Sequence, residues 1–333
     1  MNKLKTIGVS ALCGTLAAVS AYAGEMTVSG SANVTYTTQG GGDGKTDGGP
    51  LGITTGMTFA GSGELDNGNA VAVNIYHDDQ NAFSSADVSI DVAGIGKFSV
   101  DQGGGTGLDR LDDKTPTAWE EPYDAGLGSN IVTATGVGAS TDIELAISGD
   151  MLPEGLSAYI SYAPEAGQGS VNDKAVGGGD SGLGRGFDIV LEHSGLADGL
   201  NVFGGYSDID DERGADRSQK VLGFTYAAGP VTVGVQTLKD ELGEVAMDYY
   251  DNMAYGVSFL VNDNLSLSYG QHKSERAVEE VSKVELKATS MQAAYTMGGA
   301  TIKVARSTVD NASYSTTAAN DYDVNIVAMS LAF

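Results

Sequence analysis

The fold is decided by a run close to the N-terminus, which reads Thr27-Val28-Ser29-Gly30-Ser31-Ala32-Asn33-Val34-Thr35-Tyr36. Its even positions are apolar or small, and its odd positions carry a hydroxyl or an amide. Successive side chains of a β-strand point to opposite faces, so this strand has one apolar face and one polar face. The same rhythm closes the chain at Val327-Ala328-Met329-Ser330-Leu331-Ala332-Phe333. Strands of this kind are typical of a membrane-spanning β-barrel.

The first 23 residues have the composition of a secretory signal. Lys3 and Lys5 form a positive start, residues 7–19 are mainly apolar, and Ala21-Tyr22-Ala23 fits the small-x-small cleavage rule. A transmembrane anchor is the alternative, but the apolar run is short and no stop-transfer sequence follows it. We predict that residues 1–23 are a cleaved signal peptide and that residues 24–333 form a single domain.

Cleavage changes the chemistry that remains. Cys13, the only cysteine, leaves with the signal, which removes disulfides and sulfur-ligated metal sites from the mature chain. The 18 basic residues become 16 against 44 acidic ones, so the formal charge moves from −26 to −28. This balance excludes nucleic acid as a natural partner and favours cations, as counterions or as cargo. With 48 Gly and only 6 Pro, the composition suits many short strands joined by close turns.

Alternation and turn chemistry together divide the chain into short and long connections. The short ones lie at 66–69, 93–96, 151–155, 194–199, 227–230, 261–264 and 297–299, and the long ones near 38–50, 78–83, 103–138, 164–184, 208–217, 239–252, 273–283 and 308–320. Short and long connections alternate strictly, as in an up-and-down barrel whose tight turns all lie on one side of a membrane. The count predicts sixteen antiparallel strands, uncertain by two because residues 131–136 fit either loop or strand.

Aromatic residues in the apolar register gather at both ends of the predicted strands. Those at the long-loop ends are Tyr36, Tyr162, Tyr206 and Tyr269, and those at the short-turn ends are Tyr226, Phe259, Tyr295 and Phe333. Two such bands match the aromatic girdles at membrane interfaces. Strand propensity alone is the alternative explanation, but it would not sort the rings to both ends of one face.

Three places depart from this pattern. Lys220 and Arg306 fall in the outward register near long-loop ends, where a long cationic chain can reach the headgroups. The apolar register of residues 284–295 changes near Ser290, which predicts a bulge or a misjudged boundary. In the last strand Val324, Ile326 and Ala328 are apolar on the inner face, and burial under a loop is one cause.

Acidic residues dominate the predicted inner face. The predicted inward charges are Glu64, Asp87, Asp91, Asp101, Asp142, Glu144, Asp188, Glu192, Lys97 and Lys303. A sixteen-stranded barrel is too wide for side chains to fill, so we expect water inside. Each residue alone is an ordinary solvated position, but their sum predicts a field that attracts cations.

The segment 103–129 is long for a connection and holds the only tryptophan, Trp119. Such a length needs a function. It could cover the outer surface, bind a partner, or fold into the barrel and narrow it.

Four stretches resemble the general bacterial porins, particularly those of alphaproteobacteria. They are Val28-Ser29-Gly30-Ser31-Ala32, Gly63-Glu64-Leu65-Asp66-Asn67-Gly68, Ile95-Gly96-Lys97-Phe98-Ser99-Val100 before the long loop, and the terminal Phe333. The resemblance spans the mature chain as a pattern, with close matches only in those stretches. It implies an all-β transmembrane barrel of about sixteen strands, a homotrimer, and a third long loop folded into the lumen. Phe333 resembles the family's signal for insertion by the outer-membrane assembly machinery.

The resemblance also implies a constriction on the long loop. Its acidic side would be Asp109, Asp112, Asp113, Glu120, Glu121 and Asp124, with Arg110 and Lys114 beside them. The family usually opposes this loop with a cluster of arginines, but here only Lys303, Lys97 and Lys287 are candidates. This departure strengthens the expected preference for cations.

Little in the sequence indicates an enzyme or a cofactor. His77, His193 and His272 lack ligand spacing, and the glycine-rich stretches lack the helix and lysine of a phosphate loop. An acidic run offers a weak Ca²⁺ site at Asp208, Asp210 and Asp211, although a solvated loop is the simpler interpretation. We therefore expect no metal, no cofactor and no catalysis.

The leading hypothesis is a passive channel of the Gram-negative outer membrane, in contact with membrane lipid and lipopolysaccharide, that passes small hydrophilic solutes and prefers cations. Two alternatives stay open. One is a substrate-specific channel for a sugar or a cationic peptide. The other is a secreted or surface β-protein that binds glycans or partners through its loops.

Overall fold

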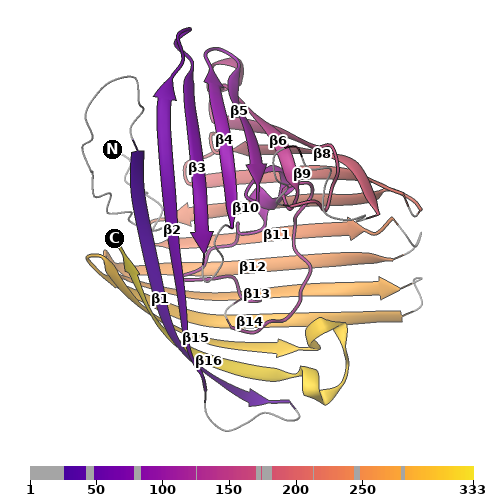
Figure 1. Cartoon of the computed structure of the whole chain (residues 1–333). Coiled ribbons are helices and arrows are strands. Elements are labelled where there is room, and N and C mark those ends of the chain that lie inside the picture. The colour runs from indigo at the N-terminus through magenta and orange to yellow at the C-terminus, as the bar shows by residue number, and fades with distance from the viewer. Residues whose placement is uncertain are drawn as a thin grey trace.

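The computed structural model is a closed barrel of sixteen β-strands (Figure 1). It describes residues 26–42, 49–78, 84–124, 126–169, 174, 182–212, 214–243, 248–278 and 282–333, so the predicted signal peptide lies outside the described residues. Each strand pairs with its neighbours in sequence, and β1 pairs antiparallel with β16 to close the sheet. The prediction of an antiparallel barrel with sixteen strands is confirmed.

The strands differ in length around the barrel. Their bounds are β1 Met26–Gly41, β2 Leu51–Glu64, β3 Ala70–Asp78, β4 Ser85–Val92, β5 Gly96–Gln102, β6 Thr141–Ile147, β7 Leu156–Ala163, β8 Leu183–His193, β9 Leu200–Asp211, β10 Arg217–Ala228, β11 Val231–Glu241, β12 Tyr249–Asn262, β13 Leu265–Val278, β14 Ser282–Met297, β15 Ala300–Asp310 and β16 Tyr322–Ala332. Four short 3-10 helices are η1 Gly107–Leu111, η2 Gly149–Met151, η3 Ala312–Tyr314 and η4 Ala318–Asn320. None of the described helical segments has the length and apolar character needed to cross a membrane.

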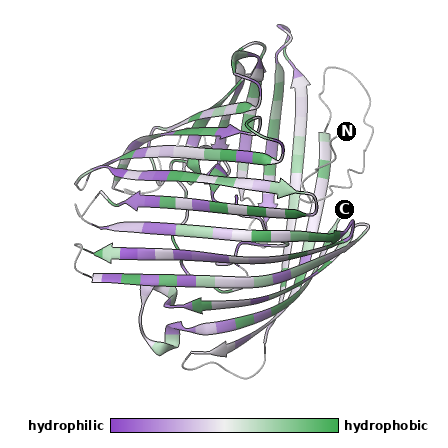
Figure 2. Ribbon diagram, turned by 180° about the vertical axis from the view of Figure 1, so that it is seen from behind, coloured by the Kyte–Doolittle hydropathy of each residue, from purple (hydrophilic) through white to green (hydrophobic). Residues whose placement is uncertain are grey.

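The two faces of the sheet differ in polarity, as the two-residue rhythm predicts (Figure 2). Outward positions expose large apolar side chains, among them Ile53, Val88 and Leu222. The predicted girdle residues are exposed there too, for example Tyr36 and Phe259. The outward face is apolar because in a transmembrane barrel it meets the hydrocarbon of the membrane.

Several strands extend further into the predicted long loops than the sequence indicates. β13 continues to Val278 and β14 begins at Ser282, so the loop predicted at 273–283 is only a few residues long. Cross-strand ion pairs accompany this extension: Lys273 Nζ lies 3.2 Å from Glu285 Oε1, and Lys283 Nζ lies 2.6 Å from Glu275 Oε1. Charged residues are therefore part of the β-ladder here. Like charges stand directly opposite each other, Lys273 with Lys287 and Glu275 with Glu285, and the two ion pairs run diagonally between them.

The predicted bulge near Ser290 is wrong. β14 pairs with β13 and β15 without a register shift. The apolar residues change face because Leu286 and Ala288 point inward, where they pack with Leu127 of the long loop. The same cluster buries Val324 and Ile326 of β16, and this confirms burial under a loop as the cause of their inward position.

The barrel closes at a glycine that receives the C-terminal ring. The Gly30 N–H donates to the Phe333 carbonyl at 2.8 Å, and the Phe333 N–H donates to the Gly30 carbonyl at 3.0 Å. A Cβ at position 30 would lie only 2.5 Å from Cε2 of Phe333. The ring therefore lies where a side chain at position 30 would stand.

Gly30→Val is expected to weaken this closure, because overpacking displaces the Phe333 ring at a cost of about 1–3 kcal/mol. The measurement is the temperature at which the folded barrel unfolds on a cold detergent gel. Gly61→Val is the matched control, since a Cβ at this outward position of β2 meets nothing within 4 Å. Equal unfolding temperatures for the two variants would contradict the role of Gly30.

Candidate functional site

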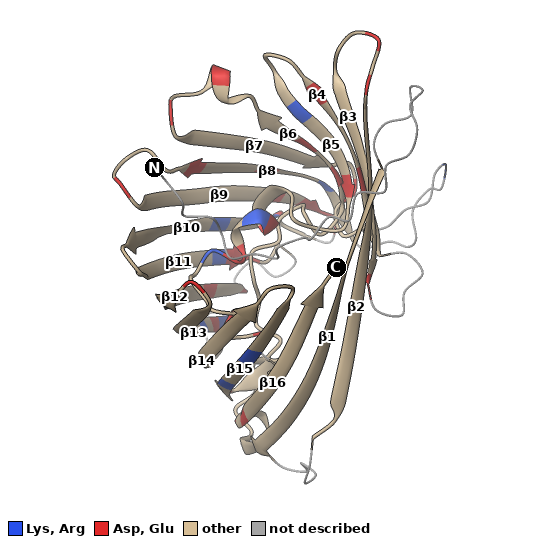
Figure 3. Ribbon diagram, turned by 90° about the vertical axis from the view of Figure 1, so that its left-hand side faces the viewer, with Lys and Arg blue, Asp and Glu red and all other residues tan. Residues whose placement is uncertain are grey.

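The connection between β5 and β6, residues 103–140, folds into the barrel and lies along its inner wall (Figures 1 and 3). Near its start, Leu108 and Leu111 of η1 pack with Val190 of β8 and Phe203 of β9. Further along, Leu127 packs against β14 and β16. The loop thus crosses much of the lumen, and residues 131–136 belong to it.

One buried carboxylate holds the outgoing and the returning limbs of the loop together. Asp188 Oδ2 on β8 accepts the N–H of Leu108 at 2.6 Å and the N–H of Val137 at 3.0 Å. Gly107 and Gly136, which precede these donors, have positive φ angles, and a Cβ at either would clash with Asp188 Oδ2. Glycine at both positions is therefore required by both conformation and space.

A row of glycines on the wall makes room for the loop's prolines. Gly234, Gly256 and Gly270 stand in register across β11, β12 and β13. A Cβ at Gly234 would lie 2.5 Å from Pro116 Cδ, and one at Gly270 would lie 2.7 Å from Pro122 Cγ. Any larger side chain in this row would push the loop toward the lumen.

Polar side chains of the wall hold the far part of the loop. Gln292 Oε1 on β14 accepts the N–H groups of Trp119 and Glu120 at 3.0 and 3.1 Å, and Gln292 Nε2 donates to the Glu120 carbonyl. Gln219 Oε1 on β10 accepts from the N–H of Gly136 at 2.8 Å. The Tyr322 hydroxyl donates to the Leu127 carbonyl at 2.7 Å. The backbone of the loop is thus hydrogen-bonded to side chains of several wall strands.

The two basic residues of the predicted constriction turn toward the wall. Arg110 is bonded to Glu144 of β6 and its guanidinium lies 3.9 Å from the centre of the Tyr159 ring. Lys114 Nζ lies 3.0 Å from Glu192 Oε1 of β8. Each base therefore neutralises a wall carboxylate that the sequence analysis had placed facing the lumen.

The acidic residues of the loop differ from one another in their exposure. Asp113 and Asp124 are exposed, while Asp109, Asp112, Glu120 and Glu121 are half-buried. Asp109 Oδ2 accepts the N–H of Gly105 at 2.6 Å and so shapes the start of the loop. Asp112 lines the space between the loop and the wall strands β11 to β13.

Burial and mutual repulsion change the titration of this acidic group. Burial raises the pKa of Asp112, and repulsion from Asp113 and Asp109 adds to it. Burial likewise raises the pKa of Glu121, which hydrogen-bonds the Asp113 carboxylate, and repulsion from that carboxylate adds to it. These carboxyl groups therefore hold protons at a higher pH than ordinary aspartate and glutamate do.

The wall residues predicted to line the pore fall into two groups. Lys97 and Asp91 are exposed and Asp101 is half-buried, whereas Asp87 accepts hydrogen bonds from Asn74 and Tyr76. The second group lies beneath the loop: Asp142, Glu144 and Asp188 are only 1%, 4% and 0% exposed. Their side chains do not face open water, because the loop covers this part of the wall.

The basic residues proposed to oppose the loop lie on different faces of the barrel wall. Lys303 of β15 points inward, with Nζ 5.3 Å from the centre of the Trp119 ring, so it lies against the loop. Lys287 points outward and its Nζ is bonded to Asp310 of β15. Lys287 is therefore not a lumen residue, because β14 has no bulge that would reverse its register.

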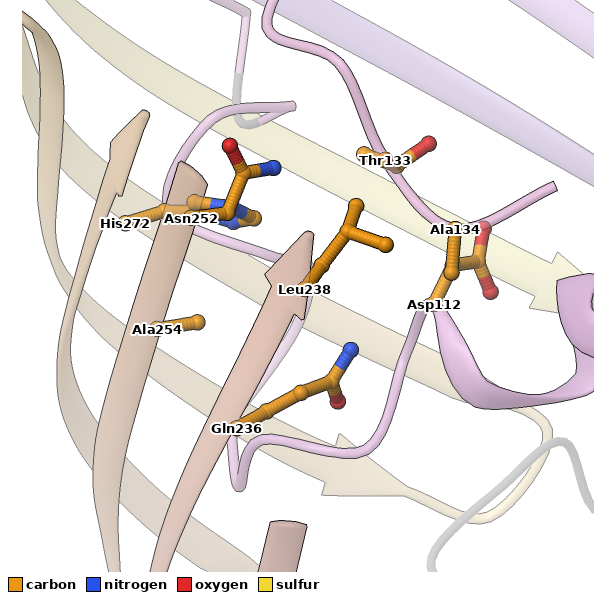
Figure 4. A pocket seen from close by; sticks show the side chains of 8 residues that line it. All are labelled: Asp112, Thr133, Ala134, Gln236, Leu238, Asn252, Ala254 and His272. Carbon is orange, nitrogen blue, oxygen red and sulfur yellow. The ribbon is translucent and has the colours of Figure 1, made fainter. Parts of the chain in front are cut away.

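A small cavity lies between the loop and the wall (Figure 4). It is lined by Asp112, Thr133 and Ala134 of the loop and by Gln236, Leu238, Asn252, Ala254 and His272 of β11, β12 and β13. The space open to the centre of a water molecule is about 10 Å³, which is room for about one. Gln236 Oε1, Asn252 Oδ1 and His272 Nε2 have no partner among the described residues.

The acidic run on β9 is arranged differently from the predicted Ca²⁺ site. The oxygens of Asp208, Asp210 and Asp216 lie within 4.8 Å of one another, whereas Asp211 points to the opposite face and is buried. β9 extends through Asp211, and adjacent residues of a strand face opposite sides. Arg185 Nε already lies 2.9 Å from Asp210 Oδ2.

Sequence reasoning missed the side chains that hold the loop in place. Gln219 and Gln292 are polar residues in the inward register, where any hydrophilic residue satisfies the pattern, and Tyr314 belongs to η3 in the connection between β15 and β16. Their partners are backbone groups of the loop, as with the Val132 N–H that donates to the Tyr314 hydroxyl. Only the glycines in register across neighbouring strands carried a signal in the sequence.

A closed transmembrane barrel with a loop folded against its inner wall defines a channel protein of a membrane. The sequence profile of a family described as Gram-negative porin matches residues 8–330, and the chain belongs to that family. It is therefore an outer-membrane channel for passive diffusion, and the family and fold are those of non-enzymatic proteins. No curated protein matches the sequence.

Solved structures of porins share the fold at low sequence identity. OmpF of Salmonella typhi, in a complex with daunomycin, is 14% identical with a TM-score of 0.69, and the match covers 93% of this chain and 98% of that one. A mutant of the Rh. blastica porin is 15% identical with a TM-score of 0.60, covering 92% and 100%. OmpT of Vibrio cholerae is 11% identical with a TM-score of 0.66, covering 92% and 98%.

Asp188→Ala is expected to loosen the loop, because it leaves the N–H groups of Leu108 and Val137 without a buried acceptor at a cost of about 1–3 kcal/mol each. Single-channel recording should show a larger and less steady conductance. Asp91→Ala is the matched control, as an exposed aspartate on the inner face of β4. A steady wild-type conductance in Asp188→Ala would refute the role of Asp188.

Proposed function

We propose that this porin passes small hydrophilic solutes and prefers cations over anions. The observation that carries the proposal is the sorting of charge on the inner loop. Asp113 and Asp124 are exposed, whereas Arg110 and Lys114 are paired with wall carboxylates. The loop therefore adds negative charge to the bore and withdraws its positive charge from it.

The exposed charged residues elsewhere on the inner face are also mainly acidic. Inward positions expose three carboxylates, Glu64 on β2, Asp78 on β3 and Asp91 on β4. Lys97 of β5 is an exposed inward base. Cations are attracted to such a lumen and anions repelled, with a strength that falls as salt screens the field. Passage needs no energy source, since size exclusion at the loop and this field are sufficient.

The outer face supports a homotrimer. The outward positions of β1 to β7 carry no Asp, Glu, Lys or Arg within the described strands. β4 to β7 are 7 or 8 residues long, whereas a strand crossing the bilayer needs about 9–11 residues. Short uncharged strands suit contact with sister barrels better than contact with lipid.

The outer face of β8 to β16, by contrast, suits contact with lipid headgroups. Outward charges near the long-loop ends are Arg185, Asp208, Asp210, Lys220, Lys239, Glu241, Asp251, Lys273, Glu275, Lys283, Glu285, Lys287, Arg306, Asp310 and Asp323, all on β8 to β16. This band fits the polar layer of the outer leaflet, including lipopolysaccharide. Residues 1–23 would direct the chain out of the cytoplasm, and Phe333 would be read by the outer-membrane assembly machinery.

In a KCl gradient across a planar bilayer, the wild-type channel is expected to give a reversal potential of cation-selective sign. Asp113→Asn combined with Asp124→Asn should lower the cation-to-anion permeability ratio about two- to threefold, since both carboxylates are exposed on the loop. Lys303→Met should raise it. Glu285→Gln, an outward carboxylate on β14, is the matched control, and an anion-selective wild type would refute the proposal.

The same ratio should depend on pH. The pKa values of Asp112 and Glu121, both raised to about 8, mean that these groups are neutral below that pH and charged above it. Cation preference should therefore increase as the pH rises from about 6 to about 9, a range where ordinary carboxylates are already fully charged. A constant ratio over that range would contradict the titration.

Val88→Arg is expected to disrupt the trimer, because it places a charge on the short uncharged face at β4. Leu222→Arg on β10 is the matched control, since it adds the same charge at an outward position of the lipid side. Native gels should show monomers for Val88→Arg and oligomers for Leu222→Arg. The reverse pattern would move the subunit contact to β10.

A further inference from the structure

The wall formed by β16, β1, β2 and β3 has a hollow that the channel function leaves unexplained. Its inward lining is Ser29 and Ser31 of β1, Gly56 and Thr58 of β2, Asp78 of β3 and Ala332 of β16. About 140 Å³ is open to the centres of water-sized molecules, roughly ten times what one water needs. The hollow therefore has room for part of a small solute.

Glycine 56 creates this hollow. Ser31, Gly56 and Asp78 stand in register across three strands. A Cβ at position 56 would lie 2.8 Å from Asp78 Oδ1 and 3.4 Å from Ser31 Oγ. The backbone of Gly56 has no positive φ, so its conformation does not require glycine. The absence of a side chain leaves the carboxylate and the hydroxyl facing one shared space.

The chemistry of the lining selects one class of solute. Three hydroxyls can each donate and accept hydrogen bonds, and Asp78 adds one negative charge. The Asp78 N–H donates to Ser84 Oγ at 2.8 Å, whereas its carboxylate has no hydrogen-bond or ion-pair partner in the described part of the chain. A solute with several hydroxyls and one ammonium group would match both features.

We propose that this hollow is a binding subsite for amino sugars and similar hydroxylated amines on their way through the channel. The inference rests on the proposed diffusion function and adds a substrate class to it. The contacts of residues 103–124 and 126–140 with the wall extend from β4 to β16, whereas the carboxylate and hydroxyls of the hollow belong to β1, β2 and β3 (Figure 3). A bound solute would therefore occupy the lumen itself and reduce the ionic current.

The test is the reduction of single-channel KCl current by added glucosamine and by added glucose. Wild type should be blocked by glucosamine at about two- to fivefold lower concentration than by glucose, the range expected of one exposed ion pair. Asp78→Asn should remove this difference. Gly56→Val should weaken the block by both sugars, because the new side chain fills the hollow.

Two control variants separate the subsite from general effects. Glu285→Gln removes an outward carboxylate of β14, and Gly52→Val fills another inward glycine of β2 outside the hollow. Both should keep the wild-type preference. A glucosamine preference that survives Asp78→Asn, or a block unchanged in Gly56→Val, would overturn the subsite. Absence of any KCl conductance in the wild type would instead overturn the proposed channel function.

Discussion

The hydrogen bonds between the loop backbone and the inner wall are the interactions on which the rest of the site depends. A loop that leaves solvent must find partners for its N–H and carbonyl groups. Asp188 holds both limbs near β8, and Gln292 holds the far part at β14. The prolines fit this path only because Gly234, Gly256 and Gly270 leave room for them. The bore is thus narrowed from one side, along a wall built to receive the loop.

The position of the loop decides which charges act in the lumen. Glu144 and Glu192 lie on strands that face inward, yet Arg110 and Lys114 neutralise them. The exposed carboxylates of Asp113 and Asp124 take their place on the surface of the loop. An acidic loop over an acidic wall is the arrangement on which the proposed cation preference rests.

The outer surface is apolar where the strands meet the hydrocarbon of the membrane. Around the barrel it is also divided into a part with outward charges and a part without them. Outward charges are confined to β8 to β16, where ion pairs such as that of Lys283 with Glu275 extend the ladder past the apolar band. The outward positions of the described strands β1 to β7 carry no Asp, Glu, Lys or Arg, and several of these strands are short. Lipid headgroups tolerate the first arrangement, and the second is the basis for the proposed contact between subunits.

The sequence by itself determined the barrel, the order of short and long connections, and the facing of nearly every strand residue. It did so because a strand's period of two is local and each face meets one solvent. Tertiary structure alone decided the path of residues 103–140, since that path depends on contacts between residues as distant as Leu108 and Asp188. It also decided that Lys287 faces outward, that Glu144 is buried, and that Asp216, just before β10, joins Asp208 and Asp210 of β9 in place of Asp211. Each of these results depends on a neighbour that periodicity does not specify.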